Sequence, residues 1–141
     1  MKNISKPILT ELKRIKVEGG DVLHGLKKSD STYINFGEAY FSFVNEDCIK
    51  AWKKHNKMTL NLIVPIGKIR FALLIDPVNG VFHTEEIGEN RYFRLTIPPG
   101  IWFGFKGIGT GSSLLMNIAD IEHDPDEVER CEILDFKYNW K

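Results

Sequence analysis

Turn signals recur at short intervals along this chain and limit every regular element to a few residues. Glycine and proline pairs such as Gly19-Gly20, Asn79-Gly80 and the segment Pro98–Gly100 mark these turns. Between them lie runs rich in β-branched and aromatic residues, for example residues 40–44 and 92–97. Many short strands separated by turns predict an all-β sandwich or small barrel. We expect one domain over residues 1–141.

Three local patterns predict particular turns. Pro65-Ile66-Gly67 stands between two apolar runs and predicts a tight hairpin, and Val78–Val81 contains an Asn-Gly pair that predicts a second one. Asp124 followed by Pro125 and several acids predicts a short helical turn, because aspartate caps helix starts and proline fits the first helical position.

The charge balance and the cysteines restrict the possible partners. Lys and Arg number 19 and Asp and Glu number 19, so the net charge is zero, which disfavours a nucleic-acid binder. Cys48 and Cys131 form no metal-type spacing and are predicted to be reduced thiols of the core. No signal peptide and no membrane-length apolar stretch is present, so we expect a cytoplasmic protein without a membrane partner.

The segment Ile49–His55 alternates apolar and basic residues. Strand periodicity predicts one face with Lys53 and the opposite face with Lys50 and Trp52. If a basic face lines a cavity, it favours an anionic ligand such as a phosphate. The alternative is a solvated edge strand that lysines protect from aggregation.

Several segments, taken in order, resemble the dTDP-4-dehydrorhamnose 3,5-epimerase family. They are residues 49–53, 62–69, 97–105, 119–121 and 135–140. The resemblance implies a small cupin-like jelly-roll β-barrel with one or two short helical turns, no cofactor, and a nucleotide sugar as the small-molecule partner. It also implies a homodimer.

The resemblance assigns catalytic positions, and most of them are altered here. The family's base falls on Lys53, its tyrosine acid on Met116 and a turn histidine on Phe103, whereas its orienting aspartate is kept as Asp120. His55, two residues beyond Lys53, is a second candidate base. A single imidazole beside lysine is a poor ligand set for zinc or iron, so no catalytic metal is expected.

The remaining candidate residues are assigned to substrate binding. Lys50 replaces the family's arginine and is expected to pair with a diphosphate. Tyr40 and Ser42 fall in the family's nucleotide-contacting stretch, of which only Ser42 is retained, and Trp102 is expected to line the pocket.

The function this implies is a metal-independent epimerase or isomerase of a nucleotide-linked 4-keto-sugar, for a surface polysaccharide such as lipopolysaccharide. Proton abstraction next to the ketone would be its central step. The alternatives are a non-catalytic cupin that binds a sugar or sugar nucleotide, and a sugar 3,4-ketoisomerase.

Overall fold

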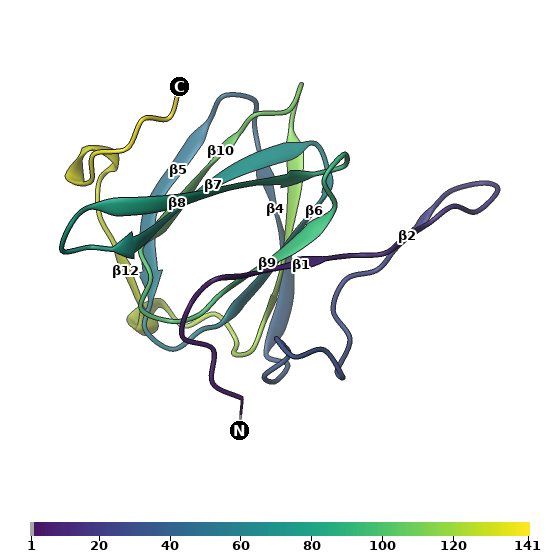
Figure 1. The fold of residues 1–141 in the computed structure, drawn as a ribbon, viewed down its shortest axis with the longest axis horizontal. Coiled ribbons are helices and arrows are strands. Elements are labelled where there is room, and N and C mark those ends of the chain that lie inside the picture. Colours follow the sequence, from purple (N-terminus) through teal and green to yellow (C-terminus); the bar gives the residue numbers. More distant parts are fainter. Residues whose placement is uncertain (1) are drawn as a thin grey trace.

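A computed structural model describes residues 2–141 and contains two five-stranded antiparallel sheets that face each other (Figure 1). The first sheet has the order β1 (Ile8–Glu11), β9 (Phe93–Ile97), β6 (Leu60–Ile66), β11 (Ser113–Ala119) and β4 (Glu38–Val44). The second has the order β12 (Val128–Arg130), β5 (Ile49–His55), β10 (Phe103–Gly107), β7 (Lys68–Asp76) and β8 (Val81–Gly88). This arrangement confirms the predicted jelly-roll, cupin-like fold.

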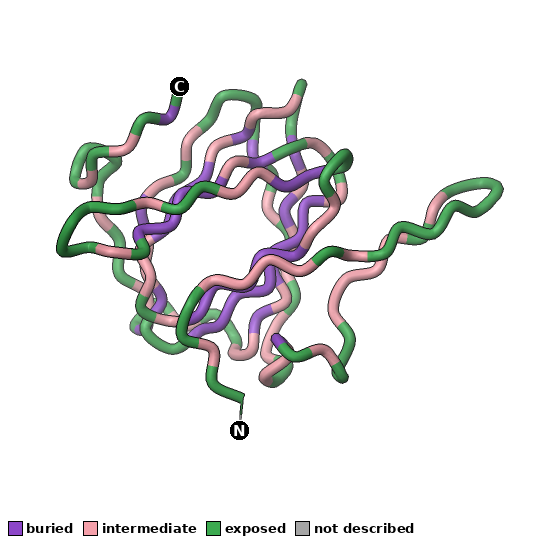
Figure 2. The backbone as a smooth tube through the Cα atoms, viewed as in Figure 1, coloured by how far each residue is buried: buried purple, intermediate pink, exposed green. Residues whose placement is uncertain are grey.

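Buried residues are concentrated on the strands of both sheets (Figure 2), and they form the core that lies between the sheets. Strand β11 shows the expected alternation, because Ser113, Leu115 and Asn117 are buried while the residues between them are only half-buried. The inner face combines aliphatic residues with aromatic rings such as Phe71, Phe103 and Phe105. Such a face removes apolar surface from water and holds the sheets together.

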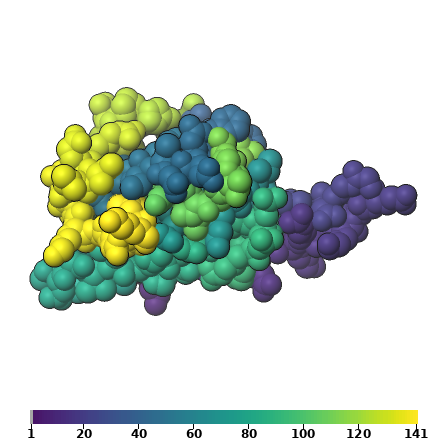
Figure 3. Space-filling view, turned by 90° about the horizontal axis from the view of Figure 1, so that it is seen from above, coloured from purple at the N-terminus to yellow at the C-terminus, as the bar shows by residue number. Residues whose placement is uncertain are grey.

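A second apolar cluster covers the outer face of the second sheet. Trp52 lies at its centre, within 5.3 Å of both Phe82 and Trp140 between ring centroids. The C-terminal segment lies against this sheet (Figure 3). The end of this segment is held on the sheet because the Trp140 carbonyl accepts hydrogen bonds from Arg70 and Lys106.

The predicted turns have mixed outcomes. The Val78–Val81 hairpin is confirmed, since β7 pairs with β8. The Pro65–Gly67 hairpin is wrong: β6 and β7 belong to different sheets, so this turn carries the chain from one sheet to the other.

Within residues 2–141 the helical content is confined to two 3₁₀ turns, η1 (Pro125–Glu127) and η2 (Ile133–Asp135). The prediction at Asp124 is confirmed, because its side chain accepts the Asp126 amide and caps η1. No helix within residues 2–141 is long and apolar enough to cross a membrane.

Strands β2 (Arg14–Ile15) and β3 (Val22–Leu23) form a hairpin arm that projects away from the barrel (Figures 1 and 3). Both cysteines are free thiols. The predicted core location is wrong for Cys48, which is exposed, whereas Cys131 is half-buried against the cluster around Trp52.

A register shift in β5 changes which lysines share a face. Phe103 lies opposite Lys53 and Phe105 lies opposite Lys50. The three-residue step from Lys50 to Lys53 on β5 therefore matches a two-residue step on β10. Opposed residues of an antiparallel pair point to the same side. Lys50 and Lys53 therefore lie on the same inner face as the two phenylalanines. The prediction that these lysines lie on opposite faces is wrong.

The other side of this bulge accommodates Trp52 in the outer cluster. Gly104 allows the close approach, because a Cβ at that position would lie 2.5 Å from the Ala51 Cβ.

Candidate functional site

A cavity of about 320 Å³ opens at the end of the barrel where β4 faces β5. Tyr40 and Glu38 line it from β4, whereas Lys53 and His55 line it from β5. His123 and Arg130 complete the lining. The two sheets thus contribute titratable groups to opposite walls of one space.

His55 is held by a carboxylate that lies far away in the sequence. Its Nδ1 lies 2.5 Å from the Glu127 Oε2, and both side chains are buried. The pairing of β12 with β5 produces this contact by setting Val128 opposite His55. Glu127 Oε1 also accepts the backbone amides of Lys57 and Met58, at 3.0 and 2.8 Å. The carboxylate is therefore fixed by the chain that connects β5 to β6.

The surroundings determine the protonation states of this pair. Burial lowers the pKa of His55, and its hydrogen bond to Glu127 only partly opposes that effect. Burial disfavours the charged form of Glu127, but the hydrogen bonds from His55 and from two amides outweigh it and hold the pKa of this carboxyl below its usual value. At neutral pH the pair is a neutral imidazole beside a carboxylate.

That state leaves one nitrogen of His55 available. An ionised carboxylate only accepts hydrogen bonds, so Nδ1 carries the imidazole proton. The other nitrogen, Nε2, is buried and has no hydrogen-bond partner among residues 2–141. Buried polar atoms are nearly always satisfied, so such an atom in a cavity wall indicates a place for a ligand atom or a proton.

Tyr40 provides a hydroxyl on the wall opposite His55. Its Oη accepts a hydrogen bond from Asn117 Nδ2 at 2.9 Å. Burial raises the pKa of Tyr40, so the phenol stays protonated at neutral pH. Asn117 is in turn held in β11, where its Oδ1 accepts the Asn61 amide. The hydroxyl is thus positioned by a buried amide.

Three cations gather beside the base. Lys50, Lys53 and Arg130 line a neighbouring cavity of about 430 Å³, which also includes Ser42. Lys53 lines both cavities, so they adjoin. Burial, reinforced by the charges of Arg130 and Lys50, lowers the pKa of Lys53 to about 8. This concentration of positive charge matches an anionic ligand.

The structure brings together five of the seven residues singled out from the sequence: Tyr40, Ser42, Lys50, Lys53 and His55. It does not bring Asp120 to His55. The Asp120 Oδ1 instead accepts the Thr59 amide at 2.7 Å, and it ties the end of β11 to the start of β6. The contact expected from Asp120 is made by Glu127.

Trp102 also lies away from the cavity. It belongs to the outer aromatic cluster, where its ring lies 5.5 Å from that of Phe136. The Lys54 ammonium lies 5.4 Å from the same ring. Trp102 precedes β10, whose first inward residue is Phe103, so strand alternation directs Trp102 outward.

Sequence reasoning missed Glu127 and Arg130. Both belong to a run of charged residues that carries no periodic apolar pattern, so nothing in the run distinguishes a buried acid from a solvated one. The available signal was the Asp124-Pro125 turn, which ends directly at Glu127. Only the pairing of β12 with β5 reveals why that position matters.

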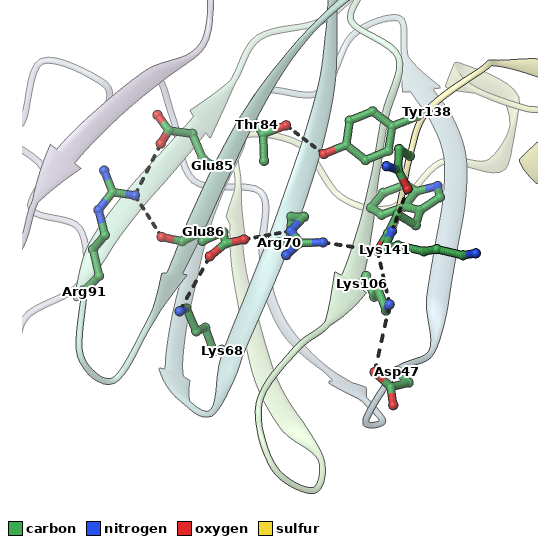
Figure 4. Close-up of polar contacts among 12 residues, drawn as sticks. Asp47, Lys68, Arg70, Thr84, Glu85, Glu86, Arg91, Lys106, Tyr138 and Lys141 are labelled. Atoms are coloured by element: carbon green, nitrogen blue, oxygen red, sulfur yellow. Dashed lines mark hydrogen bonds and ion pairs between the residues drawn. The ribbon is translucent and has the colours of Figure 1, made fainter.

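A cavity of about 730 Å³ lies elsewhere and contains none of the predicted residues. Its lining carries Lys68 and Arg91 against three carboxylates, Glu85, Glu86 and Glu89. Arg91 pairs with Glu85 and Lys68 pairs with Glu86 (Figure 4). A lining with more acids than bases offers less to an anionic ligand than the cations beside His55. In residues 2–141, no three His, Cys, Asp or Glu side chains gather as a metal site would require.

Comparison with known proteins identifies the family to which the fold belongs. A dTDP sugar isomerase from Desulfovibrio desulfuricans superimposes with a TM-score of 0.88 at 36% identity, over 95% of this chain and 90% of that one. The chain belongs to the dTDP-sugar epimerase and isomerase family. The family predicted from the sequence is thereby confirmed. No protein-family model matches the chain.

A curated relative, the probable low-salt glycan biosynthesis epimerase of Haloferax volcanii, is 34% identical over 98 residues. The match covers 63% of this chain and 62% of the relative, so the chain spans less than two thirds of that protein.

More distant structures share the fold. The dTDP-4-dehydrorhamnose 3,5-epimerase of Sulfolobus tokodaii has a TM-score of 0.81 at 20% identity, over 96% of this chain and 82% of that one. A 3,4-ketoisomerase of Thermoanaerobacterium thermosaccharolyticum, in complex with TDP-4-keto-6-deoxyglucose, has a TM-score of 0.75 at 20% identity. That alignment covers 92% of this chain and 90% of the ketoisomerase.

Proposed function

We propose that this protein is an epimerase or isomerase that moves a proton next to the ketone of a nucleotide-linked 4-keto-sugar. The observation that carries the proposal is the buried His55–Glu127 pair: the imidazole lines a cavity, and its Nε2 has no hydrogen-bond partner among residues 2–141. A neutral imidazole oriented by a carboxylate is suited to remove a proton from carbon at neutral pH.

The two walls of the cavity suit epimerisation. Inverting a carbon centre requires a base on one face of the sugar ring and an acid on the other. His55 lies on β5 and the protonated Tyr40 lies on β4, so a sugar between the sheets would meet both. Tyr40 thus acts as the acid, a role that the side chain of Met116, at the family's acid position, cannot fill. Met116 itself pairs with Phe41, on the outer face of the first sheet.

The adjoining cations suit the nucleotide diphosphate. Lys50 and Arg130 line the neighbouring cavity and place basic side chains beside the sugar site. The name of the Haloferax relative favours a glycan-building pathway for the product. A non-catalytic sugar-binding role is disfavoured, because binding alone does not require a buried imidazole with an unpartnered nitrogen.

The test is the exchange of solvent deuterium into TDP-4-keto-6-deoxyglucose, followed by mass spectrometry and NMR. We expect incorporation at carbon next to the ketone, unaffected by a chelator and abolished by His55→Asn. Inverted configuration of the product identifies an epimerase, whereas migration of the keto group identifies a 3,4-ketoisomerase. If a panel of 4-keto-sugar nucleotides binds without exchange, the non-catalytic alternative is correct.

A further inference from the structure

Lys53 has surroundings unlike those of the other lysines beside the site. Its Nζ lies 5.6 Å from the ring centre of Phe103 and 5.8 Å from that of Phe105. Among residues 2–141, no carboxylate pairs with it and no oxygen accepts a hydrogen bond from it. By contrast, Lys50 Nζ donates to the Phe43 carbonyl and Lys54 Nζ lies 3.1 Å from the Glu129 carboxylate.

The position of Lys53 places its amine beside the base. Lys53 and His55 are two residues apart on β5 and both line the same cavity. Residues at that spacing lie about 6–7 Å apart along a strand and point to one side. A sugar carbon attached to Lys53 would therefore present its neighbouring carbon toward His55 Nε2.

We propose that Lys53 is a nucleophilic lysine that condenses with the sugar ketone to form a Schiff base. The proposal rests on the proposed function and names the group that activates the ketone. Desolvated lysines near other cations are known to act in this way, because the neutral amine is the nucleophile. The lowered pKa of Lys53, about 8 because of burial and the charges of Arg130 and Lys50, supports this chemistry.

The steps balance without an added reagent. The neutral amine attacks the carbonyl carbon, and with one proton the carbonyl oxygen leaves as water, which gives a protonated imine. His55 Nε2 takes a proton from the adjacent carbon, and the electron pair moves to the imine nitrogen to form an enamine. Tyr40 returns a proton to that carbon from the other face, and water then releases the ketone and the free amine. His55 then loses its extra proton to solvent, and the Tyr40 phenolate regains a proton from solvent.

The experiment traps the imine by reduction. Wild-type protein is incubated with TDP-4-keto-6-deoxyglucose and cyanoborohydride, and intact mass and peptide mapping follow. We expect one adduct, the sugar nucleotide joined through carbon to Lys53 with loss of the ketone oxygen. Lys53→Arg keeps the charge but cannot form the imine, so it should give no adduct and at least about 100-fold less deuterium exchange. Lys54→Arg should retain both.

Two results would overturn the proposal while leaving the proposed function intact. One is wild-type protein that exchanges deuterium but is never trapped on Lys53. The other is Lys53→Arg that exchanges at nearly the wild-type rate, since Lys53 would then serve only as a cation.

A second probe does not depend on the identity of the substrate. The small diketone 2,4-pentanedione condenses with neutral amines, so it should modify Lys53 well before Lys54, with a midpoint near pH 8. If no 4-keto-sugar exchanges deuterium, the proposed function fails, and selective modification of Lys53 still supports a nucleophilic amine. Equal modification of the two lysines overturns it.

Discussion

His55 Nδ1 lies 2.5 Å from Glu127 Oε2, although 72 residues separate the two in the chain. The short strand β12 makes this possible, because it pairs with β5 directly after η1 ends at Glu127. The same carboxylate accepts two backbone amides between β5 and β6. Glu127 therefore both orients the imidazole and fixes the chain that follows it.

Glu127→Gln should lower the rate of deuterium exchange by about 100-fold or more, because the amide neither stabilises a protonated His55 nor fixes its tautomer. The exchange rate and the melting temperature should be measured together, since the substitution also weakens the amide contacts. Asp120→Asn is the matched control, because Asp120 contacts the Thr59 amide rather than His55. A larger loss of activity in Asp120→Asn than in Glu127→Gln would contradict the assignment.

Tyr40→Phe should separate proton removal from inversion. His55 can still remove and return a proton on its own face, so exchange with retention should persist while the inverted product falls by about 100-fold. NMR of the product in deuterated water measures both. Phe41→Leu provides a control on β4, because the Phe41 side chain is exposed on the opposite face of that strand. Equal yields of inverted product from Tyr40→Phe and wild type would show that the acid is another group.

The pH dependence follows from the lowered pKa of His55. The base acts only when neutral, so kcat/KM should fall as the pH drops through the folded pKa, which lies below the ordinary value of about 6.5. The free energy of unfolding should also decrease as the pH drops. Below about pH 6.5 the unfolded chain takes up a proton that folded His55 resists, so the free energy of unfolding decreases as the pH falls through this window. Comparing melting temperatures of wild type and His55→Gln between pH 7.5 and 5 isolates this contribution; parallel curves would contradict it.

Much of the fold could be predicted from the sequence, because turn residues and strand periodicity act locally. The hairpin at Val78–Val81 and the cap at Asp124 are of this kind. The Pro65–Gly67 turn shows the limit: a tight turn between two strands looks alike whether they pair or enter different sheets. Only the packing of the sheets decides between these outcomes.

The site was harder to predict for a similar reason. Periodicity assumes an unbroken strand, and the register shift opposite Phe103 and Phe105 reversed the face expected for Lys50. The family resemblance placed the orienting acid at Asp120, whereas the carboxylate that contacts His55 is brought there by a strand pairing that spans 72 residues. Tyr40 was predicted to bind substrate. Its position opposite His55 could not be predicted, because it depends on how the two sheets face each other.

The outer face of the first sheet leads to a prediction about assembly. Phe43, Leu114 and Ile66 lie side by side across β4, β11 and β6, and Phe43 and Ile66 are 70% and 54% exposed. A continuous exposed apolar patch of this kind commonly marks an interface, and a two-fold dimer would bury it on both copies. We therefore expect a homodimer in sedimentation equilibrium, which Phe43→Ser should shift toward monomer by about tenfold or more in Kd. Val78→Ser should have no effect, because Val78 is exposed in the β7–β8 turn, on the other sheet and outside this patch. A wild-type protein that remains monomeric at high micromolar concentration would contradict this assembly.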